Sequence, residues 1–515
     1  MTINTDTTAI RGLLHSEPLI FEHGSRGRNG ASLPQAGVPA YDPTEELGGL
    51  ARGEISGMPE LSEPEVMRHY VRMSQWNYGI DLGFYPLGSC TMKYNPKINE
   101  AAARLPGFAR LHPYMPDELA QGALQLMYEL QQMLSEIGGF AQTTLQPAAG
   151  AHGELAGLMM IRAYHEANGN PRKKVLVAET AHGTNAASSA LCGYQVVPIK
   201  IGPEGYLHPE DVRKLMDDDV AAVMATNPNT LGIFERHMAE ISEIVHARGG
   251  LVYGDGANMN ALLGRARPGD MGIDVMQYNL HKTFTTPHGG GGPGCGATGV
   301  SAALVPFLPV PLAAKKGDTY YLEFDRPQSI GRLRTFWGNF GMVVRAYTYI
   351  RELGAPGLKD TSGYAVLNAN YLRALLEGTY YVPYKTDALH EVVFSDKEQK
   401  KHDISTMDVA KRLIDFGIHP PTVYFPLVVA GALMVEPTET ESKETLEHFA
   451  AVMKQIAEEA KTNPDLLHNA PTMTHLSRLD ETRAARSPVL RWKPGLDVEG
   501  AGSEPEQPKR AANGR

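Results

Sequence analysis

Short apolar segments alternate with helical segments between about residues 120 and 345, and this alternation constrains the fold more than any other feature. The strand-like runs are KKVLVAE, YQVVPIK, VAAVMAT, GLVYGD, DVMQYNL and GVSAALV, in chain order. An amphipathic helix from about Pro116 to Gly139 precedes them, and helices are expected over 148–169, 209–218 and 237–248. Buried strands separated by helices are typical of a parallel or mixed sheet covered by helices. The pattern predicts a large α/β domain.

Four regions are expected along the chain. Residues 1–115 have little of the periodicity of a domain core and are predicted to form an N-terminal arm and interface segment. The large α/β domain takes residues 116–354, and a smaller C-terminal α/β domain takes residues 355–465. Residues 466–515 form a C-terminal extension whose end has the composition of a disordered tail. In the small domain, the expected strands are HEVVFS, TVYFPLVV and ALMVEP.

Composition argues against several functional classes. The 58 acidic and 48 basic residues give a net charge of −10, spread along the chain without the basic footprint of a nucleic-acid-binding protein. The longest apolar run, 424–435, is too short to cross a bilayer. No secretory signal is apparent, and three cysteines cannot make a disulfide framework. We expect a cytoplasmic protein that binds neither nucleic acid nor membranes.

An aspartate and a lysine follow two of the predicted strands, where open α/β sheets bind their ligands. Asp255 ends the run GLVYGD, and Lys282 follows DVMQYNL, just before a glycine-rich loop. A lysine in this place is suited to hold pyridoxal phosphate (PLP) as a Schiff base. The aspartate is suited to keep the pyridine nitrogen protonated, which makes the ring an electron sink. A loop lysine and a helix N-cap are the simpler explanations.

Two further features complete the predicted PLP site. The helix that begins at Gly150-Ala151 offers backbone N–H groups to a phosphate. His182, in ETAHGTNAA after another strand, is placed to lie flat over the pyridine ring. Each feature alone has a simpler explanation, a tight turn for the glycine and a satisfied loop residue for the histidine. Together, at successive strand ends of one sheet, they predict a PLP site.

Two other kinds of site are disfavoured. Gly294, Gly296 and Gly299 match a dinucleotide-binding spacing, but they precede a strand instead of opening a helix. Close approach of the backbone to the cofactor or to a partner subunit explains these glycines better. A histidine metal site lacks any HExxH-type helical spacing, so we predict no metal. The histidines considered for it are His152, His182, His281 and His288.

Several strings carry a resemblance to a known family. They are LGSCTMKYNP, AHGTNAAS, DGANMNA, NLHKTF, PHGGGGPG, RPQSIGRLRTFWGNFG, VRAYTYIRELG and EPTETESKE. From about residue 60 to about residue 465 they follow the order found in the glycine-cleavage P-proteins, the PLP-dependent glycine dehydrogenases (decarboxylating). The chain resembles this family.

The resemblance implies a fold, a reaction and partners. The fold is the type I PLP-dependent (aspartate aminotransferase-like) fold, with a large central-sheet domain and a smaller C-terminal α/β domain. The reaction is decarboxylation of glycine, with transfer of the aminomethyl group to the lipoyl group of H-protein. Since the chain has about half the length of the single-chain form, it looks like the lysine-bearing half of the split bacterial enzyme. Its expected partner is subunit 1, in an α2β2 heterotetramer.

The resemblance also assigns residues, position by position. Lys282 in NLHKTF matches the PLP lysine, and Asp255 in GDGAN matches the partner of the pyridinium nitrogen. His182 in AHGTN matches the histidine that stacks on the ring. Gly150-Ala151 in AAGAHGE matches the phosphate turn.

Two roles and two other functions stay open at this point. Thr226 is expected on the hydroxyl side of PLP, and either Lys282 or His281 is expected to carry the proton during turnover. Another PLP decarboxylase or aminotransferase would share Lys282 and Asp255 but lack GSCTMKYNP and EPTETESKE. A non-catalytic partner subunit would lack the lysine.

Overall fold

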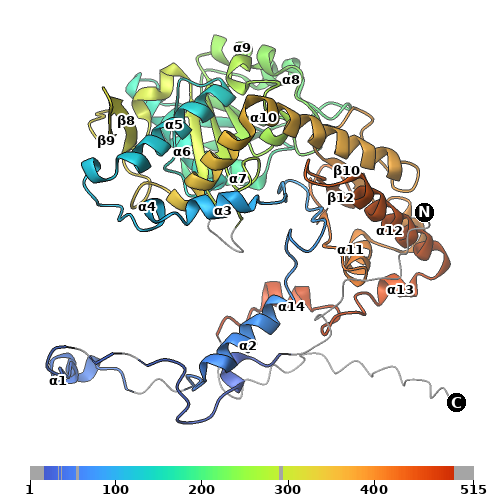
Figure 1. The fold of residues 1–515 in the computed structure, drawn as a ribbon. Coiled ribbons are helices and arrows are strands. Elements are labelled where there is room, and N and C mark those ends of the chain that lie inside the picture. The colour runs from blue at the N-terminus through green and yellow to red at the C-terminus, as the bar shows by residue number, and fades with distance from the viewer. Residues whose placement is uncertain (1–16, 33, 36, 54–56, 289–293, 492–515) are drawn as a thin grey trace. The chain divides into compact units, whose positions relative to one another are not determined.

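A seven-stranded sheet in the order β1-β7-β6-β5-β4-β2-β3 lies within residues 142–300 of the computed structural model, which describes residues 17–32, 34–35, 37–53, 57–288 and 294–491 (Figure 1). Its strands are β1 (Gln142–Thr144), β2 (Lys174–Ala178), β3 (Gln195–Ile199), β4 (Val220–Thr226), β5 (Leu251–Gly256), β6 (Val275–Asn279) and β7 (Gly296–Val300). The neighbours from β3 to β6 pair parallel, whereas β7 is antiparallel to β6 and to β1. The sheet is therefore mixed.

Successive residues of the central strands pack against different helices. In β2, Leu176 belongs to a core that includes residues of α5 (Gln121–Gly138), α8 (Pro209–Leu215) and α9 (Met238–Ala247). Its neighbours Val175 and Val177 belong to a second core with residues of α6 (Gly150–Ala167). Because successive side chains of a strand point to opposite faces, a continuously apolar strand needs cover on both sides. The run KVLVA of β2 is packed against helices on both faces of the sheet.

Two expected strands are shorter in the structure. The run GVSAALV was expected to be one strand, but β7 ends at Val300 and Ala302–Phe307 forms a 3₁₀ helix that contains Pro306. The run TVYFPLVV contributes only β11 (Thr422–Val423). Tyr424 has a φ of 57°, and Pro426 has no N–H to donate. In both runs the backbone leaves the strand conformation while the sequence is still apolar.

A second, smaller core surrounds an antiparallel sheet in the order β10-β12-β11. The sheet contains β10 (Val392–Ser395) and β12 (Ala432–Val435), and α11 (Thr406–Asp415), α12 (Lys443–Thr462) and α13 (Asp465–His468) contribute to its core. The long helix α10 (Phe340–Leu376) joins the two cores, and Figure 1 shows it running from the central sheet toward β10 and α12.

The chain divides into two compact units by contacts. Among the described residues, one unit holds residues 78–472, and the other holds residues 17–77 with 473–491. The predicted border at residue 115 lies inside the first unit, whereas the border at residue 354 coincides with a kink at Gly354 (φ 60°, ψ −175°) that divides α10 into two helical parts. The division into large and small domains stays a prediction. The last residues, 500–515, which were expected to form a disordered tail, and residues 289–293 of the glycine-rich loop lie outside the described residues.

The remaining helices and strands are short. In the first unit they are α3 (Lys97–Ala103), α4 (Pro106–Ala109), α7 (Gly183–Leu191), β8 (Leu312–Lys316) and β9 (Thr319–Glu323). In the second unit they are α1 (Thr44–Leu47), α2 (Glu63–Ser74) and α14 (Glu481–Arg486). Trp76 stacks on His475, with ring centroids 4.1 Å apart, and so joins the two chain segments of the second unit.

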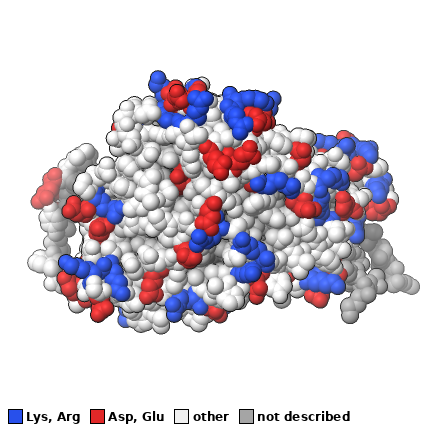
Figure 2. All heavy atoms as spheres, turned by 90° about the horizontal axis from the view of Figure 1, so that it is seen from above, with Lys and Arg blue, Asp and Glu red and all other residues white. Residues whose placement is uncertain are grey.

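Charged side chains of both signs are intermingled on the face shown in Figure 2. On α8, Arg213 pairs with Glu210 and Lys214 pairs with Asp211, while Arg248 at the end of α9 pairs with Asp218. Exposed pairs of this kind add little stability, but they keep the local net charge low. No helix among the described residues has the length and apolar character needed to span a membrane.

Candidate active site

All seven residues predicted from the sequence line one cavity of about 240 Å³. They are Gly150, Ala151, His182, Thr226, Asp255, His281 and Lys282. Most of them follow strands of the central sheet or end them. Parallel strands place their carboxyl ends at one edge, which brings residues together that are far apart in the sequence.

Lys282 lies in a tight turn directly after β6. Its backbone N–H donates to Asn279 O at 3.0 Å, and the Thr285 N–H returns to Lys282 O at 3.3 Å. Asn95 Nδ2 donates to Thr285 O at 2.6 Å. The loop is thus held by its own backbone hydrogen bonds and by Asn95, which lies 190 residues before Thr285 in the chain.

Asp255 is the penultimate residue of β5, and its carboxylate is buried at the cavity wall. Oδ1 accepts hydrogen bonds from the Ala257 N–H at 2.9 Å and from Gln277 Nε2. Oδ2 accepts one from Asn185 Nδ2 at 3.3 Å. These donors meet the requirement that a buried carboxylate be hydrogen-bonded.

Glu154 is a second carboxyl group at this wall, and the sequence analysis missed it. It is 4% exposed, and its Oε2 accepts a hydrogen bond from Asn185 Nδ2 at 2.7 Å. Burial, with a smaller contribution from Asp255, raises the pKa of Glu154 to about 8, although Asn185 and Lys282 oppose the shift. Glu154 lies four residues after Gly150 on α6, so helical spacing alone places both on one face.

We expect Glu154→Gln to stabilise the PLP-free chain more at high pH than at low pH. Glu154 keeps its proton up to about pH 8 in the folded chain, whereas the ordinary value is 4.5. Wild-type stability therefore falls as pH rises through this window, at about 1.4 kcal/mol per unit, whereas glutamine does not titrate. Thermal unfolding should show the advantage of the variant growing by about 3 kcal/mol between pH 6 and pH 9. A difference between the two proteins that is independent of pH would contradict this.

His182 precedes α7 and caps it. Its Nδ1 accepts a hydrogen bond from the Thr184 N–H at 3.2 Å and lies 2.9 Å from Thr184 Oγ1. His182 lines the cavity and is exposed. Partial burial of the ring lowers the pKa of His182. Asp255 opposes this shift, and Lys282 adds to it. A neutral ring held at Nδ1 presents a flat face.

An aromatic replacement of His182 should retain more activity than alanine does. If the ring serves as a flat surface for a bound cofactor, His182→Phe keeps that surface, whereas His182→Ala removes it and also the cap. We expect the cofactor to be bound about tenfold more weakly in the alanine variant, a loss of about 1.4 kcal/mol. Titration of the visible absorbance of bound cofactor measures this. Equal affinity of the wild type and His182→Ala would remove the residue from the site.

Gly150 opens α6 where no larger residue fits. A Cβ at this position would lie 1.8 Å from Asn279 Oδ1, and Ala149 before it is extended. The first N–H groups of a helix have no acceptor within it, and they form the positive end of its dipole. The start of α6 therefore suits an anionic group.

Two further positions leave polar groups without partners at the cavity. Thr226 Oγ1 and Asn258 Oδ1 are buried and have no hydrogen-bond partner among the described residues. Buried polar atoms are almost always paired in native proteins. These unpaired atoms point to a polar ligand.

His281 also lines the cavity, beside Lys282. Its Nδ1 accepts the Cys295 N–H at 3.2 Å. Burial, with a smaller effect of Lys282, lowers the pKa of His281 to about 4. Near pH 7 its ring is therefore neutral.

The three glycines with dinucleotide-like spacing were expected to precede a strand, but only Gly294 does so, and the other two lie on β7. Gly296 begins β7 and Gly299 lies within it. A Cβ on Gly296 would come within 2.4 Å of Ala149 O, and one on Gly299 within 2.6 Å of Phe140. The close approach is thus to the chain's own backbone and core.

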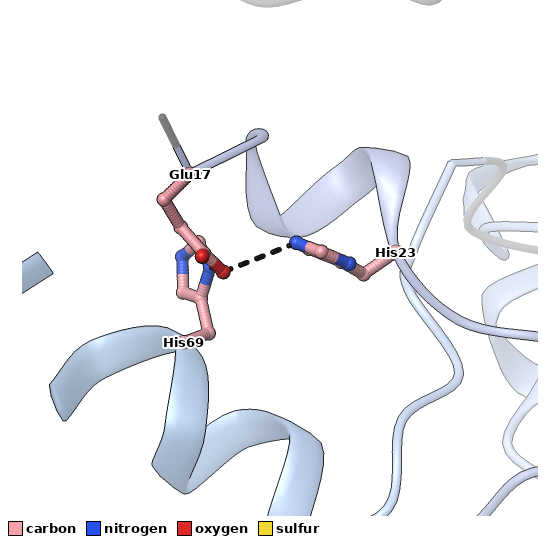
Figure 3. Close-up of side chains that lie close together, drawn as sticks. All are labelled: Glu17, His23 and His69. Atoms are coloured by element: carbon pink, nitrogen blue, oxygen red, sulfur yellow. Dashed lines mark hydrogen bonds and ion pairs between the residues drawn. The ribbon is translucent and has the colours of Figure 1, made fainter. Parts of the chain in front are cut away.

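A separate cluster of possible metal ligands lies in the second unit. Figure 3 shows the imidazoles of His23 and His69 directed at the carboxylate of Glu17, with His69 Nδ1 at 3.0 Å and His23 Nε2 at 3.3 Å from Oε1. Arg72 Nη2 also donates to Oε1 at 2.7 Å, and Arg72 above all lowers the pKa of Glu17 to about 2. Because the guanidinium already neutralises the carboxylate, the cluster is best explained as ion pairs that fasten residues 17–23 to α2.

Two protein families match the chain. The model described as glycine cleavage system P-protein matches residues 55–319, and the model described as glycine dehydrogenase, C-terminal domain, matches residues 361–472. A probable glycine dehydrogenase (decarboxylating) subunit 2 of Listeria welshimeri is 55% identical over 92% of this chain and 98% of its own length. The protein of the same name from Lysinibacillus sphaericus is 56% identical over 93% of this chain and 100% of its own length.

Solved structures agree on the fold. A glycine decarboxylase (P-protein) in inhibitor-bound form matches with a TM-score of 0.67 at 20% identity, over 82% of this chain and 100% of that one. An aspartate aminotransferase from Thermus thermophilus matches with a TM-score of 0.55 at 15% identity, over 73% of this chain and 100% of that one. The expected aspartate aminotransferase-like α/β fold is confirmed.

Proposed function

Because the chain belongs to the glycine cleavage system P-protein family, in its glycine dehydrogenase (decarboxylating) subunit 2 form, we propose that its cavity holds PLP covalently on Lys282 for the decarboxylation of glycine. The observation that carries this proposal is the convergence of Lys282, Asp255 and the start of α6 on one cavity. These groups match the aldehyde, the ring nitrogen and the phosphate of PLP, respectively.

The other residues of the cavity fit the remaining parts of PLP. The unpaired Thr226 Oγ1 and Asn258 Oδ1 offer partners for a polar ring substituent. The exposed face of His182 fits a planar ring. Replacing Gly150 by any larger residue would push a side chain into Asn279 at the phosphate end. The residues present thus fit the cofactor that the fold family uses.

PLP, when bound, supplies the electron sink for the electrons released when the carboxylate of glycine leaves as CO2. Asp255 would hold the proton of the ring nitrogen, with its own orientation fixed by Ala257, Gln277 and Asn185. Lys282 Nζ would hold the cofactor between turnovers. Lys282 Nζ, or His281 beside it in the same cavity, would carry the proton during turnover.

We further propose that the aminomethyl group passes to the lipoyl group of H-protein and that subunit 1 completes the enzyme as an α2β2 heterotetramer in the cytoplasm. The relatives' designation as subunit 2 supports a partner. Exposed apolar side chains before the central sheet also support one, since apolar surface of this kind is usually buried against a partner. The most exposed are Val38, Tyr41, Leu50, Leu82 and Leu119, with 66–87% of their surface accessible.

Mixing experiments test this function. The chain alone should bind PLP weakly and release no CO2 from glycine, whereas addition of subunit 1 and lipoylated H-protein should restore both activities. Light scattering should show a larger complex at the same time. The Lys282→Ala chain, mixed in the same way, is the control for assembly without catalysis. Full turnover by the isolated chain as a monomer or homodimer would contradict the proposed split enzyme.

A further inference from the structure

A strained turn forms part of the wall of the Lys282 cavity. Ser89 lines the cavity, and both Ser89 (φ 62°) and Thr91 (φ 47°) adopt the left-handed backbone conformation. Residues with a Cβ rarely adopt it, and such strain persists only where surrounding contacts hold the backbone.

Two buried glutamates supply those contacts. Glu391 Oε2 accepts the Ser89 N–H at 2.7 Å. Glu436 accepts the Thr91 N–H at 2.8 Å on Oε2 and the Thr91 hydroxyl at 2.6 Å on Oε1. Both side chains are 0% exposed. Each strained residue therefore donates its backbone N–H to its own buried carboxylate.

The small sheet places the two glutamates side by side. Val392 of β10 pairs with Val435 of β12, so Glu391 and Glu436 adjoin that pair at the same end of the ladder. Leu87 bridges to Val435 there as well. Burial raises the pKa of both carboxyl groups, and Lys282 opposes this shift in both.

The same chain segment also holds the loop that carries Lys282. Asn95 Nδ2 donates to Thr285 O at 2.6 Å, and Asn99 Nδ2 donates to Thr285 Oγ1 at 3.1 Å. Thr285 itself has a φ of 58°. Residues 88–99 thus connect the small sheet at one end with the Lys282 loop at the other.

We propose that Glu391 and Glu436 are positioning residues, which hold the turn of residues 88–91 against the cavity and thereby fix the placement of Lys282 and of bound glycine. This proposal rests on the proposed function and deepens it. Because both carboxylates are fully buried, they act through Ser89, Thr91 and the loop, and not by contact with the reacting atoms.

Variants of Glu436 in the holoenzyme, reconstituted with PLP and subunit 1, test the proposal. Glu436→Ala should lower kcat/KM for glycine at least tenfold and shift the visible absorbance maximum of bound PLP. Glu436→Ala combined with Thr91→Gly should recover most of both, because glycine adopts a φ of 47° without strain. A double variant no better than Glu436→Ala would contradict the proposal.

Asp396 provides a matched control on the same small sheet. It follows β10, is 1% exposed, and its Oδ2 accepts the Thr406 N–H at 2.9 Å and the Thr406 hydroxyl at 2.8 Å. Asp396→Ala should lower the thermal midpoint without changing the PLP spectrum or kcat/KM. If Asp396→Ala and Glu436→Ala lose stability alike and both keep the wild-type spectrum and kcat/KM, the positioning role is wrong.

A second pair of variants covers the case in which Glu436→Ala does not fold. Glu391→Gln keeps an oxygen that accepts the Ser89 N–H and should retain the wild-type spectrum, whereas Glu391→Ala should not. Identical spectra of these two variants would overturn the proposal. If borohydride attached no PLP to the wild-type protein, that result would instead contradict the proposed function itself. The two failures are therefore distinguishable.

Discussion

Lys282→Ala is expected to abolish covalent attachment of PLP and to lower glycine decarboxylation by at least about 10³-fold, or about 4 kcal/mol of transition-state stabilisation. The reason is that Lys282 is the lysine that lines the cavity, with Asp255 and the start of α6 around it. Borohydride treatment followed by mass spectrometry of peptides should find the label on Lys282 in the wild type and on no residue in the variant.

The exposed Lys173 provides the control for this experiment. Lys173→Ala should keep the label on Lys282 and keep full activity. A wild-type label on any other lysine would show that the assignment of Lys282 is incorrect.

Asp255→Asn is expected to lower turnover by about 10²-fold or more, or about 3 kcal/mol, while PLP still binds. Asparagine keeps an oxygen that accepts hydrogen bonds from Ala257 and Gln277, but it removes the negative charge at the ring nitrogen. The loss should therefore be in kcat, with little change in the affinity for PLP. Steady-state kinetics and an absorbance titration separate the two quantities.

Asp274 offers a matched control at the opposite edge of the same sheet. It directly precedes β6, and its Oδ2 accepts the Val252 N–H at 2.9 Å and pairs with His246. Asp274→Asn should lower stability and leave kcat unchanged. Near-normal turnover of Asp255→Asn, or an equal loss in both variants, would exclude the proposed role of Asp255.

The sequence predicts the cavity well because its residues follow simple positional rules. Asp255, Thr226 and Lys282 lie at or just after the ends of parallel strands, and such ends share one edge of the sheet. Gly150 begins a helix of 18 residues. A glycine directly before a stretch of periodic apolar residues predicts the start of such a helix. These rules need no knowledge of distant contacts.

The same reasoning misses groups whose role depends on long-range packing. Lys93 is 3% exposed and donates to Glu439 Oε1 at 2.7 Å, across 346 residues of sequence. Glu391 and Glu436 meet the turn of residues 88–91 across similar separations. No local periodicity marks such partners. Strand ends at Val300 and Val423 were also missed, because turn geometry and proline end the ladder within apolar runs.

Release of CO2 from carboxyl-labelled glycine tests the central claim most directly. The chain, mixed with subunit 1, PLP and lipoylated H-protein, should release the label as CO2 and leave an aminomethyl group on H-protein in equal amount. Omitting H-protein should reduce the release strongly. Formation of glyoxylate with the carboxyl label retained would instead identify an aminotransferase, and the absence of both products from a PLP-loaded complex would contradict the account.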